Sequence, residues 1–222
     1  TQATRTITRD SDVPTITIST IAGDDIINAT EDNSDVIISG TTTGVEEGRV
    51  VTVSLNKKTY TGAVKTNLWS VTVPAVNAQA LKVSETVTAD VSDVAENAAP
   101  QATKNIIHDS EVPIITISII AGDDIINKAE DNSDVIISGT TSGAEEGQAV
   151  TVGLNEKIHM DSVAKEVWSV PVPAVDAHVL EGTEIVTADV SELSGNNAVQ
   201  ATREISHNTD QPVVSIGAPS TL

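Results

Sequence analysis

Apolar and polar residues alternate with a period of two along most of this chain. Ile16 and Ile18 are each flanked by threonine or serine, and Val71 has the same neighbours. This period places successive side chains on opposite faces of a β-strand, whereas an amphipathic helix repeats every 3.6 residues. The alternating segments of the first half predict seven short strands, at residues 15–19, 36–42, 51–55, 58–64, 69–73, 87–91 and 99–107.

The whole strand pattern occurs twice. The segment Gln2–Arg5 returns at residues 101–104 and again at 200–203, each time 99 positions further along, and Trp69 returns as Trp168. About 60 of the 99 aligned positions are identical, which identifies copies of one domain. The sequence predicts four parts: residues 1–12 as the last strand and linker of a preceding repeat, 13–110 as repeat 1, 111–209 as repeat 2, and 210–222 as the start of a following repeat or a tail.

Seven short strands with turn residues about every ten positions are typical of two antiparallel sheets, each with one face buried. The chain is therefore predicted to be all-β, with tandem Ig-like antiparallel β-sandwich domains of about seven strands each, stacked end to end. Trp69 is expected in the core because it continues an alternating strand. A helical turn is predicted only at residues 75–81, after Pro74 ends the strand before them.

The charge of the chain excludes several classes of partner. The 222 residues carry a formal net charge of −20, which argues against nucleic acid and against direct contact with an anionic membrane. The sequence lacks an apolar run of about 20 residues, so a membrane-spanning helix is not expected. It also lacks a recognisable signal peptide, so we expect either an internal fragment of a longer chain or an export signal at a distant C-terminus. Cysteine is absent, and a secreted domain without disulfides can gain stability from bound metal instead.

The acidic residues gather in the predicted loops and linkers. End-to-end stacking would bring together the loop at 23–35, the linker at 109–111, and two loops of the second copy, at 143–147 and 189–196. Carboxylates that meet in this way repel one another unless a cation lies between them. Ca²⁺ accepts six to eight oxygen ligands in flexible geometry, so loops of this composition suit it.

The sequence therefore predicts Ca²⁺ at the linkers between domains. The candidate ligands are Asp10, Asp12, Asp24, Asp25, Asp109, Glu111, Asp123, Asp124, Glu145, Glu146 and Asp210. Softer metals are not expected, since Cys is absent and His scarce. In particular, His108 is matched by Arg9 in the preceding linker, and His159 and His178 are matched by no His in the first copy. The alternative interpretation is that the acids form a solvated surface that keeps the protein soluble.

Four segments of the first copy, which recur in the second, resemble the bacterial Ig-like repeat of giant RTX-type adhesins and biofilm-associated surface proteins. These segments are Ala22–Asn28, Val36–Thr41, Trp69–Ala75 and Val87–Asp93. The resemblance implies an Ig-like sandwich, Ca²⁺ in and beside the linkers, type I secretion and a spacer role on the bacterial surface. One departure is Glu96, which stands where the second copy has Gly195 in a turn that favours glycine.

These features predict a structural extender, or stalk, of a large bacterial adhesin that is rigidified by Ca²⁺ and located outside the cell. The expected partners are neighbouring repeats of the same chain, and we expect a monomer without a small-molecule substrate. An enzyme is not expected. The carboxylate pair Asp24 and Asp25 stands in an array of similar copies without an aromatic sugar platform, and nothing in the sequence fixes the geometry of a Ser-His-Asp triad. The alternative is an Ig-like module that itself binds glycan or protein, through the divergent segments 59–68 and 158–167.

Overall fold

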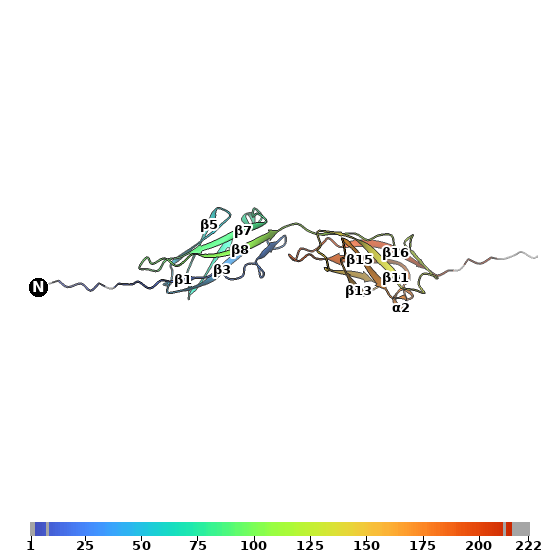
Figure 1. Cartoon of the computed structure of the whole chain (residues 1–222). Helices are drawn as coiled ribbons and strands as arrows, with labels where there is room; N and C mark the ends of the chain where they lie inside the picture. The colour runs from blue at the N-terminus through green and yellow to red at the C-terminus, as the bar shows by residue number, and fades with distance from the viewer. Residues whose placement is uncertain (1–2, 8, 211, 215–222) are drawn as a thin grey trace, which may run out of the picture. The chain divides into compact units, whose positions relative to one another are not determined.

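The computed structural model describes residues 3–7, 9–210 and 212–214. The chain divides into two compact units, Thr1–Glu111 (unit 1) and Val112–Leu222 (unit 2). Each unit is a sandwich of two β-sheets (Figure 1). This confirms the prediction of an all-β fold made of tandem sandwiches.

In unit 1 the two sheets have three and five strands, in the orders β1-β3-β6 and β2-β8-β7-β4-β5. The elements are β1 (Thr15–Ile16), β2 (Ile26–Asn28), β3 (Val36–Thr43), β4 (Val50–Leu55), β5 (Lys58–Ala63), β6 (Leu68–Val73), α1 (Ala75–Ala78), β7 (Ser84–Asp90) and β8 (Ala102–Asp109). All pairs are antiparallel except β2 and β8, which run parallel.

Unit 2 repeats this topology, with sheets in the orders β14-β11-β9 and β10-β16-β15-β12-β13. Its elements are β9 (Ile114–Ile115), β10 (Ile125–Asn127), β11 (Val135–Ser142), β12 (Ala149–Leu154), β13 (Lys157–Ser162), β14 (Val167–Val172), α2 (Ala174–Ala177), β15 (Gly182–Val190) and β16 (Ala201–Asn208). The parallel pair here is β10 with β16.

The core of each unit lies between the sheets and consists mainly of Ile and Val, the residue types that pack well on a pleated surface. Trp69 fills the centre of unit 1, as its place in the alternating pattern predicts. Gly40 makes room for it, since a Cβ there would come within 2.7 Å of the indole and 1.9 Å of the Thr17 carbonyl oxygen. Gly139 and Trp168 repeat the arrangement in unit 2.

The short strands β2 and β10 were not predicted, because the segment that contains them was interpreted as one long loop. Three residues are too few to show an alternating pattern among so many polar neighbours. β2 pairs with the end of β8 and places Asn28 opposite Asp109, one of the sequence-predicted ligands. The predicted helical turn forms as α1 in unit 1, and α2 repeats it in unit 2. Among the described residues, no helix is long and apolar enough to cross a membrane.

Candidate functional site

Asp24 and Asp25 lie just before β2, where they fix the entry of the chain into that strand. The Oδ1 atom of Asp24 accepts a hydrogen bond from the N–H of Ile26 (2.9 Å). Asp25 uses both oxygens: Oδ1 accepts the N–H of Ile21 (2.8 Å), and Oδ2 pairs with Nζ of Lys104 on β8 (2.7 Å). Partial burial raises the pKa of Asp25, but these bonds outweigh it and leave that pKa below its ordinary value.

Asp123 and Asp124 repeat the arrangement in unit 2 with a stronger cation. Asp123 accepts the N–H of Ile125 (3.1 Å). Asp124 accepts two hydrogen bonds from Arg203, each of 2.6 Å, and one from the N–H of Ile120 (3.0 Å). The Arg203 guanidinium holds the pKa of Asp124 below its ordinary value, and Asp124 raises the pKa of Arg203 in turn. Asp25 and Asp124 thus tie the loop before β2 or β10 to the last strand of the same unit.

The acidic pairs after β3 and β11 cap neighbouring loops. Glu145 accepts the N–H of Leu193 (3.0 Å), and Glu146 accepts the N–H of Lys165 (2.8 Å). Unit 1 has the same two bonds, from Val94 to Glu46 and from Thr66 to Glu47, both of 2.8 Å. Each bond uses a single carboxylate oxygen of a solvent-exposed side chain, so these residues combine a structural role with an exposed negative charge.

The turn after β7 is held by Asp93, which is buried. Its oxygens accept hydrogen bonds from the backbone N–H (2.7 Å) and the side-chain amide (2.8 Å) of Asn97. The amide bond is the main reason that the pKa of Asp93 lies below its ordinary value. Glu96 takes a left-handed φ of 67° in this turn, as Gly195 does with 85° in unit 2. The departure from glycine therefore does not abolish the turn.

The three linkers share one local structure, in which a side-chain oxygen accepts the N–H two residues later. Asp12 donates to Asp10 (3.0 Å) and Glu111 to Asp109 (3.2 Å), while Asp210 donates to Asn208 (2.9 Å). This turn type is typical of Asp and Asn. The carboxylates of Asp10, Asp12 and Asp210 are solvent-exposed, so the linkers present oxygen ligands on defined backbone turns.

The carboxylate oxygens on the linkers and loops are of the kind that bind Ca²⁺. Among the described residues, the structure does not show them gathered around one cation position. Within either unit, the described side chains include no group of three or more His, Cys, Asp or Glu residues arranged to hold a metal ion. The eleven sequence-predicted ligands fall into three sets: those on linker turns, those that cap loops, and Asp25 and Asp124, whose oxygens pair with a cationic side chain.

A buried His–Asp pair lies beside the end of the last strand in unit 1 and was missed in the sequence. Nδ1 of His108 bonds to the carbonyl oxygen of Leu81 (3.1 Å), and Nε2 lies 3.0 Å from Oδ2 of Asp32. Both side chains are less than a tenth exposed. The sequence feature that could have revealed this pair is its repetition, since Asp32 and His108 return 99 residues later as Asp131 and His207.

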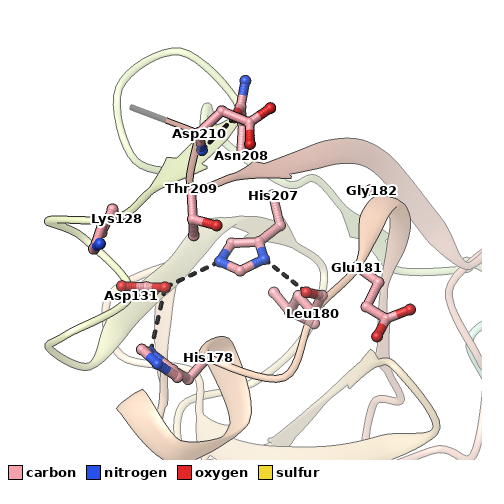
Figure 2. Close-up of a pocket in the computed structure, with 10 residues that line it drawn as sticks. All are labelled: Lys128, Asp131, His178, Leu180, Glu181, Gly182, His207, Asn208, Thr209 and Asp210. Carbon is pink, nitrogen blue, oxygen red and sulfur yellow. Dashed lines mark hydrogen bonds and ion pairs between the residues drawn. The ribbon is translucent and has the colours of Figure 1, made fainter. Parts of the chain in front are cut away.

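In unit 2 the same pair lines a cavity of about 540 Å³ and gains a second histidine. Nε2 of His207 lies 3.1 Å from Oδ2 of Asp131, and Nδ1 of His178 lies 3.3 Å from the same oxygen. Figure 2 shows the two rings approaching one side of the carboxylate. His178 thus has an acidic and a histidine neighbour that the repeat alignment did not suggest, because unit 1 has Gln79 at this position.

Solved structures show where this architecture occurs, although no protein-family model and no curated protein matches the sequence. A Ca²⁺-stabilized adhesin with which an Antarctic bacterium reaches out and binds ice is 29% identical (TM-score 0.57), over 90% of this chain and 50% of that chain. A 1.5-MDa bacterial ice-binding adhesin, described for its retention at the host cell surface, is 28% identical (TM-score 0.51), over 91% and 67%. Each unit is therefore similar to the domains of these bacterial adhesins.

The predicted family resemblance and Ig-like fold are thereby confirmed. A structure of CbhA fibronectin(III)-like modules from Clostridium thermocellum shares only the fold with this chain. It is 13% identical with a TM-score of 0.54, over 90% of this chain and all of that one. The chain spans half the length of the first adhesin structure.

Proposed function

We propose that the chain is an extender segment of a bacterial surface adhesin, in which stacked repeats project a distal binding domain from the cell. The observation that supports this most directly is the tandem itself: two sandwiches 99 residues apart, about 60 positions of which are identical, with sequence similarity to two adhesins. Tandem copies of one domain suit a spacer, since length grows with copy number while each copy keeps the same fold. On this proposal the segment is extracellular, monomeric and not catalytic.

We further propose that Ca²⁺ bound at the linkers stiffens the tandem. The residues that would hold it are the linker acids Asp10, Asp12, Asp109, Glu111 and Asp210, together with Asp24, Asp123, Glu145 and Glu146. Asp25 and Asp124 would contribute mainly by fixing the backbone beside Asp24 and Asp123, because their own oxygens pair with Lys104 and Arg203. One of the related adhesins is itself Ca²⁺-stabilized, which supports the choice of metal.

Bound Ca²⁺ would supply positive charge between carboxylates that otherwise repel one another. Extracellular modules bind Ca²⁺ with dissociation constants of about 10⁻⁴–10⁻³ M. Each site would add about 1.4 kcal/mol of stability at a tenfold excess of Ca²⁺ over its Kd. The linkers would then be stiff outside the cell and flexible in the low-calcium cytosol, a difference that would assist secretion.

The experiment is to compare thermal unfolding and small-angle scattering of the two-repeat chain in Ca²⁺ and in EGTA. We expect a higher melting temperature and a longer, less flexible particle in Ca²⁺. The double variant Asp109→Asn with Glu111→Gln should lose the change in particle length. The matched double variant Asp10→Asn with Asp12→Asn should keep it, since these residues precede the first repeat. Equal melting temperatures and equal dimensions in both buffers would refute the calcium proposal.

A second candidate function is supported by one surface in unit 2. Ile158 and Met160 on β13 are 69% and 61% exposed, whereas unit 1 has Thr59 and Thr61 at these positions. Because β13 is an edge strand, this apolar pair is accessible to a binding partner. Binding of glycan or protein that is lost in the double variant Ile158→Thr with Met160→Thr would favour a binding module over a pure spacer.

A further inference from the structure

The cavity at the end of β16 contains a hydrogen-bonding arrangement that needs an extra proton or a metal ion. Nδ1 of His207 lies 2.6 Å from the carbonyl oxygen of Leu180, and a carbonyl can only accept, so Nδ1 carries the hydrogen. In the neutral ring Nε2 is then an acceptor, yet it faces a carboxylate oxygen of Asp131 at 3.1 Å. Two acceptors at this distance require a proton between them, carried by the ring or by the carboxyl group, or a metal ion.

The carboxylate of Asp131 is also short of partners. Its side chain is 1% exposed, and its Oδ1 atom is buried without a hydrogen-bond partner. Burial of a charged oxygen without a compensating group is unfavourable, so such an atom commonly marks the place of a water or an ion. Figure 2 shows this carboxylate at the wall of the cavity, between Lys128 and the two histidines.

The spacing of the three side chains suits a transition metal. Ligand atoms around a tetrahedral Zn²⁺ lie about 3.3 Å apart, given metal–ligand distances of about 2.0–2.1 Å. Oδ2 of Asp131 lies 3.1 and 3.3 Å from the nitrogens of His207 and His178. The bond from Nδ1 of His207 to a backbone carbonyl is the outer contact that usually orients a metal-binding imidazole.

We propose that Asp131, His178 and His207 of unit 2 bind one divalent transition-metal ion of the zinc class. As placed, a nitrogen of each ring faces the same oxygen of Asp131. In the described part of the chain these side chains do not yet form a group that could hold a metal ion. His178 must turn about its side-chain bonds, and its 61% exposure leaves it room to do so. Bound metal would join the loop after β10, the segment after α2 and the end of β16. Imidazole nitrogens distinguish this site from the all-oxygen linker sites.

Unit 1 provides an internal control, because it has the His–Asp pair without the second histidine. Gln79 occupies the position of His178, and its amide donates to Oδ1 of Asn33 (3.1 Å). His108 and Asp32 alone can be satisfied by one proton on the ring. The expected stoichiometry is therefore one zinc-class ion per two-repeat chain.

The test is isothermal titration of the tag-free, EDTA-treated chain with Zn²⁺, with Ca²⁺ present in excess to occupy oxygen sites. We expect one bound Zn²⁺ and, with Co²⁺, a visible spectrum of tetrahedral type. His178→Gln should weaken binding at least about tenfold, and Gln79→His should create a second site in unit 1. Lys128→Ala, a cavity substitution that matches Ala29 of unit 1, should bind Zn²⁺ at least as well as the parent.

Three results would overturn the proposal. The first is the absence of Zn²⁺ binding by a chain whose circular dichroism shows it to be folded. The second is equal Zn²⁺ affinity in the parent and His178→Gln. The third is protonation of His207 at neutral pH, seen by NMR and unchanged by added Zn²⁺, which would show that a proton alone satisfies Asp131. None of these results depends on whether Ca²⁺ stiffens the linkers.

Discussion

The two repeats share the interior and differ mainly at exposed side chains, on strand β5 or β13 and at one end of the sandwich. Trp69 and Trp168 are 3% and 2% exposed, and the two glycines that face them approach a backbone oxygen equally closely. The loop caps are also the same, with a carboxylate accepting the same backbone N–H in each unit. Features that recur in this way are those on which the fold of a single repeat depends.

The differences described next lie at side chains outside the core, which contact residues that both units share. Asp25 pairs with Lys104, whereas Asp124 pairs with Arg203 through two bonds. The backbone bond to each Asp is the same in both units. The carboxylate is therefore required by the loop, and the cation can vary. By contrast, His178 stands where unit 1 has Gln79 and places a second imidazole beside the His–Asp pair.

The largest expected effect comes from Gly40→Ala or Gly139→Ala. The added Cβ would lie 1.9 or 1.8 Å from a backbone carbonyl oxygen, so β3 or β11 must shift away from the segment after β1 or β9. We expect the free energy of unfolding of the substituted unit to fall by about 3 kcal/mol or more. The two substitutions should have effects of similar size, each in its own unit. Urea unfolding followed by Trp fluorescence measures it, with Trp168→Phe or Trp69→Phe leaving one reporter in the unit of interest.

The control is Gly153→Ser, which introduces the residue that unit 1 carries as Ser54. Its Cβ would approach only the flexible hydroxyl of Thr187, at 2.6 Å, so the effect should be small. If Gly139→Ala lowered the urea midpoint of unit 2 no more than Gly153→Ser did, the close approach at the tryptophan would not be a determinant of the fold.

A middle-sized effect is expected from the Asp pairs. Asp25→Asn and Asp124→Asn keep an acceptor for the backbone N–H but remove the charge, and each should destabilise its unit by about 1–2 kcal/mol. The loss should be larger in unit 2, because Arg203 makes two contacts. Arg203→Lys, which makes unit 2 resemble unit 1, should give an intermediate urea midpoint. A larger loss in unit 1 would contradict this ranking.

The ion pairs of Asp25 and Asp124 determine how the stability of each unit changes with pH. The pKa values of Asp25 and Asp124 are lowered in the folded chain, so their stabilisation is present above the ordinary Asp pKa of about 3.9. It is lost as the pH falls through the lowered value. The difference between the parent and Asp124→Asn should therefore be constant near neutral pH and shrink below about pH 4. A difference that grew on acidification would show that Asp124 is not the charged partner.

The fold could be predicted from the sequence because its main signals are local and repeated. Strands such as β6 have clean alternation over six residues, and the 99-residue repeat doubles each signal. The strand β2 could not be predicted, since it has three residues and forms by parallel pairing with β8, about 80 residues away. Pairing over that separation leaves no periodic signal in so short a segment.

The acids were predicted as one class, but the structure separates them by their partners. Asp24 and Asp25 are neighbours in the sequence, yet one faces solvent and the other lies against Lys104. The repeat alignment alone could not show this, because it records identity and not contact. It also favoured features common to both copies, so His178, which occurs only once, was set aside.

The smallest effect is expected at the turn after β7, where unit 1 has Glu96 and unit 2 has Gly195. Glu96 adopts a left-handed φ that costs a non-glycine residue about 1 kcal/mol, and its ion pair with Arg49 (3.3 Å) is too exposed to offset this fully. Glu96→Gly should therefore stabilise unit 1 by about 0.5 kcal/mol. Gly195→Glu should destabilise unit 2 by about 1 kcal/mol, because Gln148 there offers no cation. Urea midpoints that moved in the same direction for both variants would mean that contacts, rather than backbone conformation, distinguish the two turns.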